Sequence, residues 1–199
     1  MSNTAETMAA EQFAAYVTDH QMTVLHDDGL YRHLRFGCRG AVGWFEIVTW
    51  PGTLTIHGDL GGTHTFSRLT DMFEFFRDRP INPGYWAEKT PDYGISLREY
   101  SEDVFREQVV DALADLDGSD EETTQAAKRI LTALDDGDAH DEDGAHELLR
   151  DGKDAGLWSD SWERDLTYWS LPYLRACHGI VWAIRQYDAA KSPAMPVVG

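Results

Sequence analysis

Short runs of aromatic and β-branched residues alternate with turn signals between residues 22 and 68. The run Trp44–Trp50 is apolar on both of its faces, which is typical of a central strand covered above and below. Asp27-Asp28-Gly29, Pro51-Gly52 and Gly61-Gly62 are turn signals between neighbouring runs. The pattern predicts an antiparallel meander of about four or five strands, over residues 22–26, 30–36, 44–50, 53–59 and 63–68.

Apolar residues recur at helical spacing in the rest of the chain. Phe13, Tyr16 and Val17 predict a helix over 9–20, and the capping box Ser119-Asp120-Glu121-Glu122 predicts the start of another. Further helices are expected over 69–77, 101–116, 145–151 and 170–189. We therefore expect an α+β fold, in which the antiparallel β-meander packs with N-terminal, middle and C-terminal α-helices. The expected organisation is a disordered lead-in over 1–8, a single domain over 9–190 with a β-rich core at 22–68 and a helical part at 101–190, and a tail over 191–199.

The charge balance narrows the range of partners. The chain has 35 acidic residues against 17 basic ones, and its formal net charge is -18 at pH 7. This balance argues against direct binding of nucleic acid, because phosphate binding needs clustered Lys and Arg. It permits docking on a protein partner that has a basic surface. It is also compatible with an acidic surface that only keeps the protein soluble.

Cysteine usage and the N-terminus indicate the compartment. Cys38 and Cys177 are the only two cysteines and form no Cys-x-x-Cys pair, which favours a reducing environment. Residues 1–10 carry acids and no apolar run, so they do not resemble a signal peptide. No apolar stretch approaches the roughly 20 residues that cross a bilayer. We expect a cytoplasmic protein with no membrane association; neither a cofactor nor an oligomeric state is indicated.

Two acidic stretches are candidate partner-binding surfaces. They are Asp115–Glu122 and Asp135–Asp143. The run Asp136–Glu147, which overlaps the second stretch, has acids at the first, third and twelfth positions of a calcium-binding loop. Its sixth position is Asp141, where such a loop needs glycine, so a solvated connection between helices is the better interpretation and no metal site is assigned. The candidate surface consists of Asp115, Asp117, Asp120, Glu121, Glu122, Asp135, Asp136, Asp138, Asp141, Glu142 and Asp143.

The hairpin around Gly61-Gly62 contains a second candidate site. A two-residue turn there pairs Asp59 with His64 and Thr55 with Arg68, which places His57, Asp59, His64 and Arg68 on one face. Two imidazoles and a carboxylate could ligate a metal, or act as a base beside an anion-binding guanidinium. The alternative is an exposed polar face with no ligand. A longer turn changes the register and separates these side chains.

Tyr85 and Trp86 lie in an irregular, proline-containing segment next in the chain. Loop aromatics can stack on a base or anchor an interface, although they also plug the edges of cores. No nucleophile elbow, phosphate-binding loop, dinucleotide fingerprint or zinc-protease motif is present. The sequence therefore favours a protein without catalytic activity.

Several segments resemble a family of uncharacterised proteins carried by bacteriophages and prophages. The resemblance covers about residues 45–90 and 170–190, and leaves the acidic middle of the chain least covered. In that family Met often stands at the position of Leu60, and the Gly61-Gly62 turn is one residue longer here. The resemblance implies a phage or mobile-element setting but no particular activity. It rests on Val48–Gly52 (VTWPG), Gly58–Gly61 (GDLG), Phe66–Arg68 (FSR), Asp71–Phe76 (DMFEFF), Ile81–Lys89 (INPGYWAEK) and His178–Asp188 (HGIVWAIRQYD).

Two functional hypotheses follow. The first is an acidic interaction protein of phage origin that inhibits a host defence system, anti-CRISPR-like or of another kind, by presenting carboxylates where a basic partner expects phosphates. The second is a protein that binds or hydrolyses a small ligand such as a nucleotide. It would use the face of His57, Asp59, His64 and Arg68, together with Tyr85 and Trp86.

Overall fold

The computed structural model describes residues 2–38, 43–115, 121–159 and 165–192. The chain forms two compact units: the α/β unit, Ser2–Leu97 with Trp169–Gly199, and the helical unit, Arg98–Tyr168. Each unit buries an apolar core of its own. The single domain expected over 9–190 is thus divided, because the helices of the middle segment bury their apolar stripes against one another. The helical unit interrupts the α/β unit in sequence.

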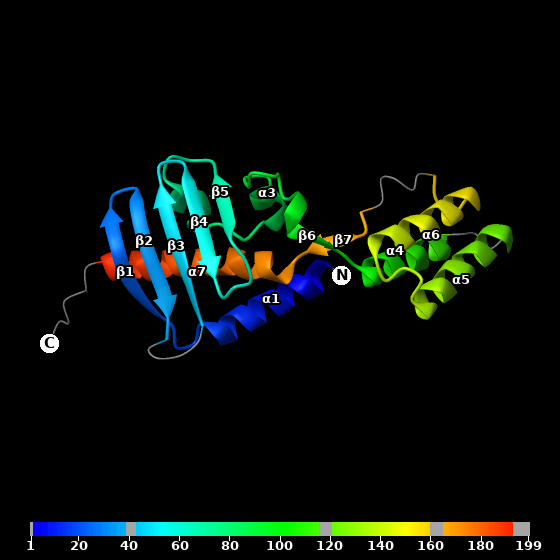
Figure 1. The fold of residues 1–199 in the computed structure, drawn as a ribbon, viewed down its shortest axis with the longest axis horizontal. Coiled ribbons are helices and arrows are strands. Elements are labelled where there is room, and N and C mark those ends of the chain that lie inside the picture. The colour runs from blue at the N-terminus through cyan, green and yellow to red at the C-terminus, as the bar shows by residue number, and fades with distance from the viewer. Residues whose placement is uncertain (1, 39–42, 116–120, 160–164, 193–199) are drawn as a thin grey trace. The chain divides into compact units, whose positions relative to one another are not determined.

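The α/β unit is built on a five-stranded antiparallel sheet with strand order β1-β2-β3-β4-β5 (Figure 1), which confirms the predicted α+β meander. Gly29 and Gly52 adopt positive φ angles of 62° and 83° in two of the connecting turns, where glycine carries no steric penalty. The strands are β1 (Gln21–Asp28), β2 (Tyr31–Gly37), β3 (Trp44–Trp50), β4 (Thr53–Gly58) and β5 (His64–Ser67).

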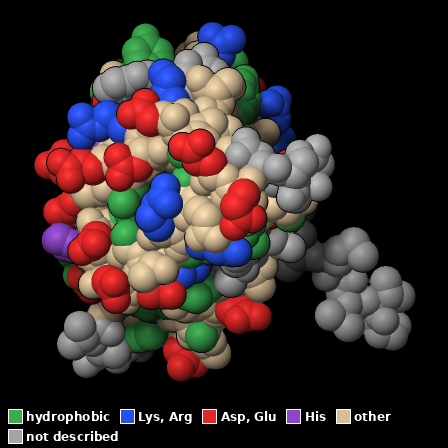
Figure 2. Space-filling model, turned by 90° about the vertical axis from the view of Figure 1, so that its right-hand side faces the viewer, with side chains coloured by type: hydrophobic (Ala, Val, Ile, Leu, Met, Phe, Trp, Pro, Cys, Tyr) green, Lys and Arg blue, Asp and Glu red, His purple; other side chains and the backbone are tan. Residues whose placement is uncertain are grey.

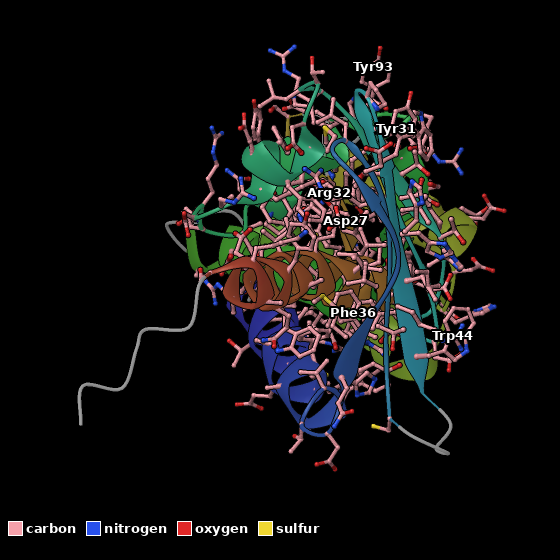
Figure 3. All side chains as sticks on the ribbon, turned by 90° about the vertical axis from the view of Figure 1, so that its left-hand side faces the viewer. Asp27, Tyr31, Arg32, Phe36, Trp44 and Tyr93 are labelled. Atoms are coloured by element: carbon pink, nitrogen blue, oxygen red, sulfur yellow. The ribbon has the colours of Figure 1, made fainter. Side chains whose placement is uncertain are left out.

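Two long helices of the α/β unit, α1 (Ser2–Tyr16) and α7 (Leu171–Lys191), lie on one side of this sheet (Figure 1). Figure 3 shows Phe36 on the side that faces α7 and Trp44 on the opposite side. The alternation of side chains along each strand separates the two faces. The buried side chains of the inner face come mainly from β2 to β5, and they are Leu34, Phe36, Phe45, Ile47, Leu54, Ile56 and Phe66. No described helix of the α/β unit covers the outer face, although the two apolar faces of β3 predicted cover on both.

Short helices close the remaining edges of this core. Asp71 caps α2 (Met72–Phe76) by accepting a hydrogen bond from the backbone N–H of Phe73, and Asn82 caps α3 (Pro83–Ala87) in the same way through Tyr85. The hydroxyl of Tyr173 donates to the carbonyl of Pro83 at 2.6 Å, which ties α3 to α7 inside the core.

The N-terminal segment differs from its prediction. Residues 1–8 were expected to be a disordered lead-in, whereas α1 begins at Ser2. The helix extends this far because Ala5 is half-buried and continues the buried row of Ala9 and Phe13 at a spacing of four residues. The expected tail over 191–199 lies mostly outside the described residues, and α7 continues to Lys191.

In the described part of the helical unit the chain forms three helices: α4 (Glu102–Asp115), α5 (Glu121–Asp136) and α6 (Glu142–Asp154). Phe105 of α4, Ile130 of α5 and Leu149 of α6 meet in a buried core. The ring of Trp158 closes that core, and its Nε1 donates to the carbonyl of Leu149 at 2.9 Å. Where the chain enters and leaves this segment, β6 (Arg98–Tyr100) pairs with β7 (Thr167–Trp169), and Ile95–Leu97 form a 3₁₀ turn before β6.

Candidate functional site

The predicted site on the β4–β5 hairpin is not assembled. Ile56, rather than Asp59, pairs with His64, and Thr53 pairs with Ser67, so seven residues rather than two lie between the paired ends. The prediction that His57, Asp59, His64 and Arg68 share one face was therefore wrong. The reason is the longer turn, which moves β5 along β4 and turns His64 to the other side of the sheet.

Each predicted residue of the hairpin has a separate environment. His64 faces the core and packs edge-on against Tyr173, with 5.7 Å between ring centroids. His57 lies on the outer face, and Asp59 accepts a hydrogen bond from the backbone N–H of Trp44 at 3.1 Å. Arg68 is exposed beyond the end of β5. The hairpin offers no convergent set of ligands.

On the outer face the structure gathers a different cluster around Glu46. The sheet register places Arg35, Glu46 and His57 directly opposite one another on β2, β3 and β4. Arg35 Nη1 donates to Glu46 Oε1 at 2.6 Å, His33 Nε2 lies 2.7 Å from Oε2, and His57 Nε2 lies 3.4 Å from the same oxygen. Glu46 is only 8% exposed although it lies on this uncovered face, because these side chains surround it.

Electrostatics explain why a buried carboxylate is tolerated here. Burial alone raises the pKa of Glu46, but the hydrogen bonds from His33 and Arg35 outweigh it, and the net pKa is lowered from its ordinary value. The guanidinium of Arg35 also lies over the ring of Trp44, 4.4 Å from its centroid. Since the carboxylate oxygens are already engaged, we interpret the cluster as an ion-pair network that orders the outer face.

Tyr85 and Trp86 do not act as a pair. Trp86 is 1% exposed and packs edge-on against Phe76 in the core, with ring centroids 4.7 Å apart. Tyr85 is 39% exposed, and its ring lies beneath Lys89, whose Nζ is 4.1 Å from the centroid. Both residues lie in the short helix α3 and not in an irregular segment as predicted. Trp86 has a structural role in the core, while Tyr85 remains accessible.

The predicted acidic surface lies entirely within the helical unit. Asp117 and Asp120 fall outside the described residues; the other nine, Asp115, Glu121, Glu122, Asp135, Asp136, Asp138, Asp141, Glu142 and Asp143, are exposed. Figure 2 views the molecule from the side on which Figure 1 draws α4–α6, and Asp and Glu side chains are spread across it with Lys and Arg between them. Residues 98–168 contain 22 of the 35 acidic residues and seven of the 17 basic ones, a net charge of -15 out of -18.

Part of this acidity supports the local fold. Asp141 caps α6 by accepting from the backbone N–H of Gly144 at 2.9 Å, and Asp135 accepts from Arg106 at 2.7 Å. Asp141 stands at the sixth position of the run that was compared with a calcium-binding loop. Because it caps α6, this run does not form such a loop. No group of three or more His, Cys, Asp or Glu side chains in the described ranges is arranged to hold a metal ion.

The Glu46 cluster was missed by the sequence interpretation. The alternation of Tyr31, His33 and Arg35 already places these side chains on one face of a strand. Pairing them with Glu46 requires the register between β2 and β3, which are connected through residues 38–43. No short-range turn rule sets that register.

No protein-family model, curated protein or solved structure matches this chain. The resemblance to phage and prophage proteins therefore stays a prediction. Among the helices that the structure describes, none combines the length and the apolar character needed to span a bilayer.

Proposed function

We propose that this protein binds a protein partner with a basic surface, and that the helical unit carries the binding surface. The observation that supports this is the concentration of charge: 71 of the 199 residues, 98–168, hold a net charge of -15, and the rest of the chain holds -3. An acidity that served solubility alone would not need this segregation into one unit.

The exposed carboxylates suit electrostatic recognition. Asp136, Asp138 and Asp143 are exposed in and beside the α5–α6 connection, and no basic side chain pairs with them within the described ranges. Charges of one sign on one face raise the rate at which an oppositely charged partner associates, and they suppress binding of acidic competitors. Such a surface can occupy a site that otherwise receives phosphates.

The biological setting is part of the same proposal. The phage-like motifs at residues 45–90 and 170–190 suggest a protein that acts on a bacterial host. A basic groove of a nucleic-acid-binding defence protein, whether of a CRISPR system or another, is then the partner class that the acidic unit fits best. We propose no catalytic step.

Affinity capture tests the binding surface. The immobilised chain is incubated with nuclease-treated bacterial lysate, and bound proteins are eluted with a NaCl gradient and, separately, with duplex DNA. We expect the retained partner to be basic and to be released by both treatments, because salt screens charge and DNA competes for the same surface. The test variant neutralises four exposed acids of the helical unit: Glu122→Gln, Asp136→Asn, Asp138→Asn and Asp143→Asn.

A matched control removes four negative charges from the α/β unit. It carries Glu11→Gln, Asp28→Asn, Glu74→Gln and Asp78→Asn, all at exposed positions. The control should retain the partner and the test variant should lose it. Equal retention by both variants, or no salt-sensitive partner at all, would contradict the proposal. For the defence setting, expression of the chain should restore phage plating on a host that carries an active defence system, and the test variant should not.

A further inference from the structure

A groove of about 660 Å³ lies between α1, α7 and the segment Arg79–Ile81 within the α/β unit. Both helices present a continuous face to it. The lining positions are 10, 13 and 14 on α1, with 17 and 18 in the turn that follows it, and 178, 181, 182, 185 and 186 on α7, which is the spacing of one helical face. Because Ala10 and Ala14 carry only methyl groups, α1 leaves room that larger side chains would fill.

The charge of the groove is opposite to that of the protein. Arg79 and Arg185 line it together with His20 and His178, and none of its lining residues is acidic. Glu6 lines a smaller, adjoining hollow instead. The nearest carboxylates that act on the lining histidines are those of Glu6, beside His178, and Asp19, beside His20, and neither lines the groove.

The two arginines are available to a ligand. Within the described part of the chain, neither Arg79 nor Arg185 forms an ion pair, and Arg79 lies 5.9 Å from the centroid of Phe75. The one acidic residue of α7, Asp188, is already held by Arg77 through two hydrogen bonds of 2.8 and 3.0 Å. The guanidinium of Arg185 is thus not neutralised by its neighbour on the helix.

Rings held by the core form the wall of the groove. His178 stacks on Phe13 with 6.2 Å between centroids and 23° between ring planes, and Trp182 contacts Phe36 edge-on at 5.4 Å. Trp182, which is only partly buried, is oriented by its contacts with Phe36 and with Phe13. His20 also lines the groove, and its buried Nε2 has no hydrogen-bond partner among the described residues.

We propose that this groove binds a small phosphate-bearing ligand with a planar ring, of the nucleotide class, with Arg79 and Arg185 holding the phosphate and Trp182 contacting the ring. The guanidinium fork matches phosphate oxygens in pairs, which makes phosphate the anion that two free arginines recognise best. The volume of the groove is in the range of small-molecule sites, so a phosphate alone would leave most of the groove empty. The apolar wall supplies a surface for a ring beside the charged end.

Calorimetric titration of the full chain at low salt tests this assignment. The probes are the four ribonucleoside 5′-monophosphates, with adenosine and inorganic phosphate as separate arms. At least one nucleotide should bind about tenfold or more tightly than either adenosine or phosphate, because only the nucleotide engages both ends of the site.

Three variants locate the binding. Arg79→Gln with Arg185→Gln should weaken nucleotide binding by about tenfold or more, since charge-assisted hydrogen bonds are lost. Ala14→Phe should abolish it by filling the groove, and a far-ultraviolet spectrum reports whether the fold is kept. Arg68→Gln, an exposed arginine of the same unit outside the groove, is the matched control and should leave binding unchanged.

Three outcomes would overturn the assignment. They are an absence of binding by every nucleotide, equal binding by the double arginine variant, and phosphate alone binding as tightly as the nucleotides. The groove belongs to the α/β unit, so the variant that neutralises four acids of the helical unit should still bind the nucleotide. Failure of one proposal therefore leaves the other intact.

Discussion

Arg32 and Asp71 form a bidentate pair in which Arg32 Nη1 and Nη2 donate to the two carboxylate oxygens, each at 2.9 Å. Asp71 Oδ1 also accepts from the backbone N–H of Phe73, and the guanidinium lies 4.5 Å from the centroid of the Phe73 ring. One carboxylate thus caps α2 and binds a side chain of β2. Figure 3 shows Arg32 beside Asp27 on the side of the sheet that faces α7.

Removing Arg32 should leave an uncompensated carboxylate in a largely buried position. We expect Arg32→Met to lower the free energy of unfolding by about 3 kcal/mol, measured by urea denaturation. Adding Asp71→Asn should recover part of this loss, because asparagine keeps the helix cap without the charge. Arg68→Met, at an exposed position beyond the end of β5, is the control and should change the free energy of unfolding by about 0.5 kcal/mol or less. If the double variant loses as much free energy of unfolding as the two single variants together, Arg32 and Asp71 are not coupled.

The Glu46 cluster should contribute stability that depends on pH. The pKa of Glu46 is lowered in the folded protein, so its contribution is present above its ordinary value of 4.5 and is lost as the pH falls through the lower folded pKa. Glu46→Gln should therefore cost about 1–3 kcal/mol at pH 7 and progressively less below pH about 4. Urea denaturation of both proteins across this range measures the difference. A difference in the free energy of unfolding between the two proteins that stays constant with pH would contradict the proposed contribution of the Glu46 carboxylate.

His64 should make the fold sensitive to mild acid. Burial lowers its pKa from the ordinary value of 6.5, so the unfolded chain binds the proton first and the free energy of unfolding falls as the pH drops below 6.5. His64→Leu should flatten this dependence between pH 7.5 and 5.5, where each unit of pKa shift corresponds to about 1.4 kcal/mol. The exposed His26→Gln serves as the control and should keep the wild-type slope.

Gly152 should resist replacement although it lies inside helix α6. A Cβ placed there would approach Cε2 and Cη2 of the buried Trp158 ring to 2.8 Å, and Cζ2 more closely still. Gly152→Ala should destabilise the protein by about 1–3 kcal/mol, against the normal helix preference for alanine. Glu147→Ala on the exposed face of the same helix should have little effect. Thermal unfolding, read from the near-ultraviolet signal, separates the two variants.

The sequence by itself determined the fold class and most of the secondary structure, but not the start of α1 or the short helix α3. The alternation in Leu30–Phe36 and the apolar residues of Trp44–Trp50 predicted β2 and β3 closely, because strand periodicity is a local property of the chain. The apolar faces of the helices and the turn at Pro51-Gly52 could also be predicted, because they too depend on residues that are close in the chain. The total charge and the acidic character of the middle segment were also evident from composition alone.

The tertiary structure determined the register between β4 and β5, the division of the chain into two units and the candidate sites. The seven-residue connection between Ile56 and His64 separates side chains that a two-residue turn would have grouped. The groove of Arg79 and Arg185 brings together α7 and a loop about 100 residues earlier in the chain. Such relationships depend on long-range packing, which local spacing does not encode. For this reason the sequence determined which elements form, and only the fold determined which of their side chains meet.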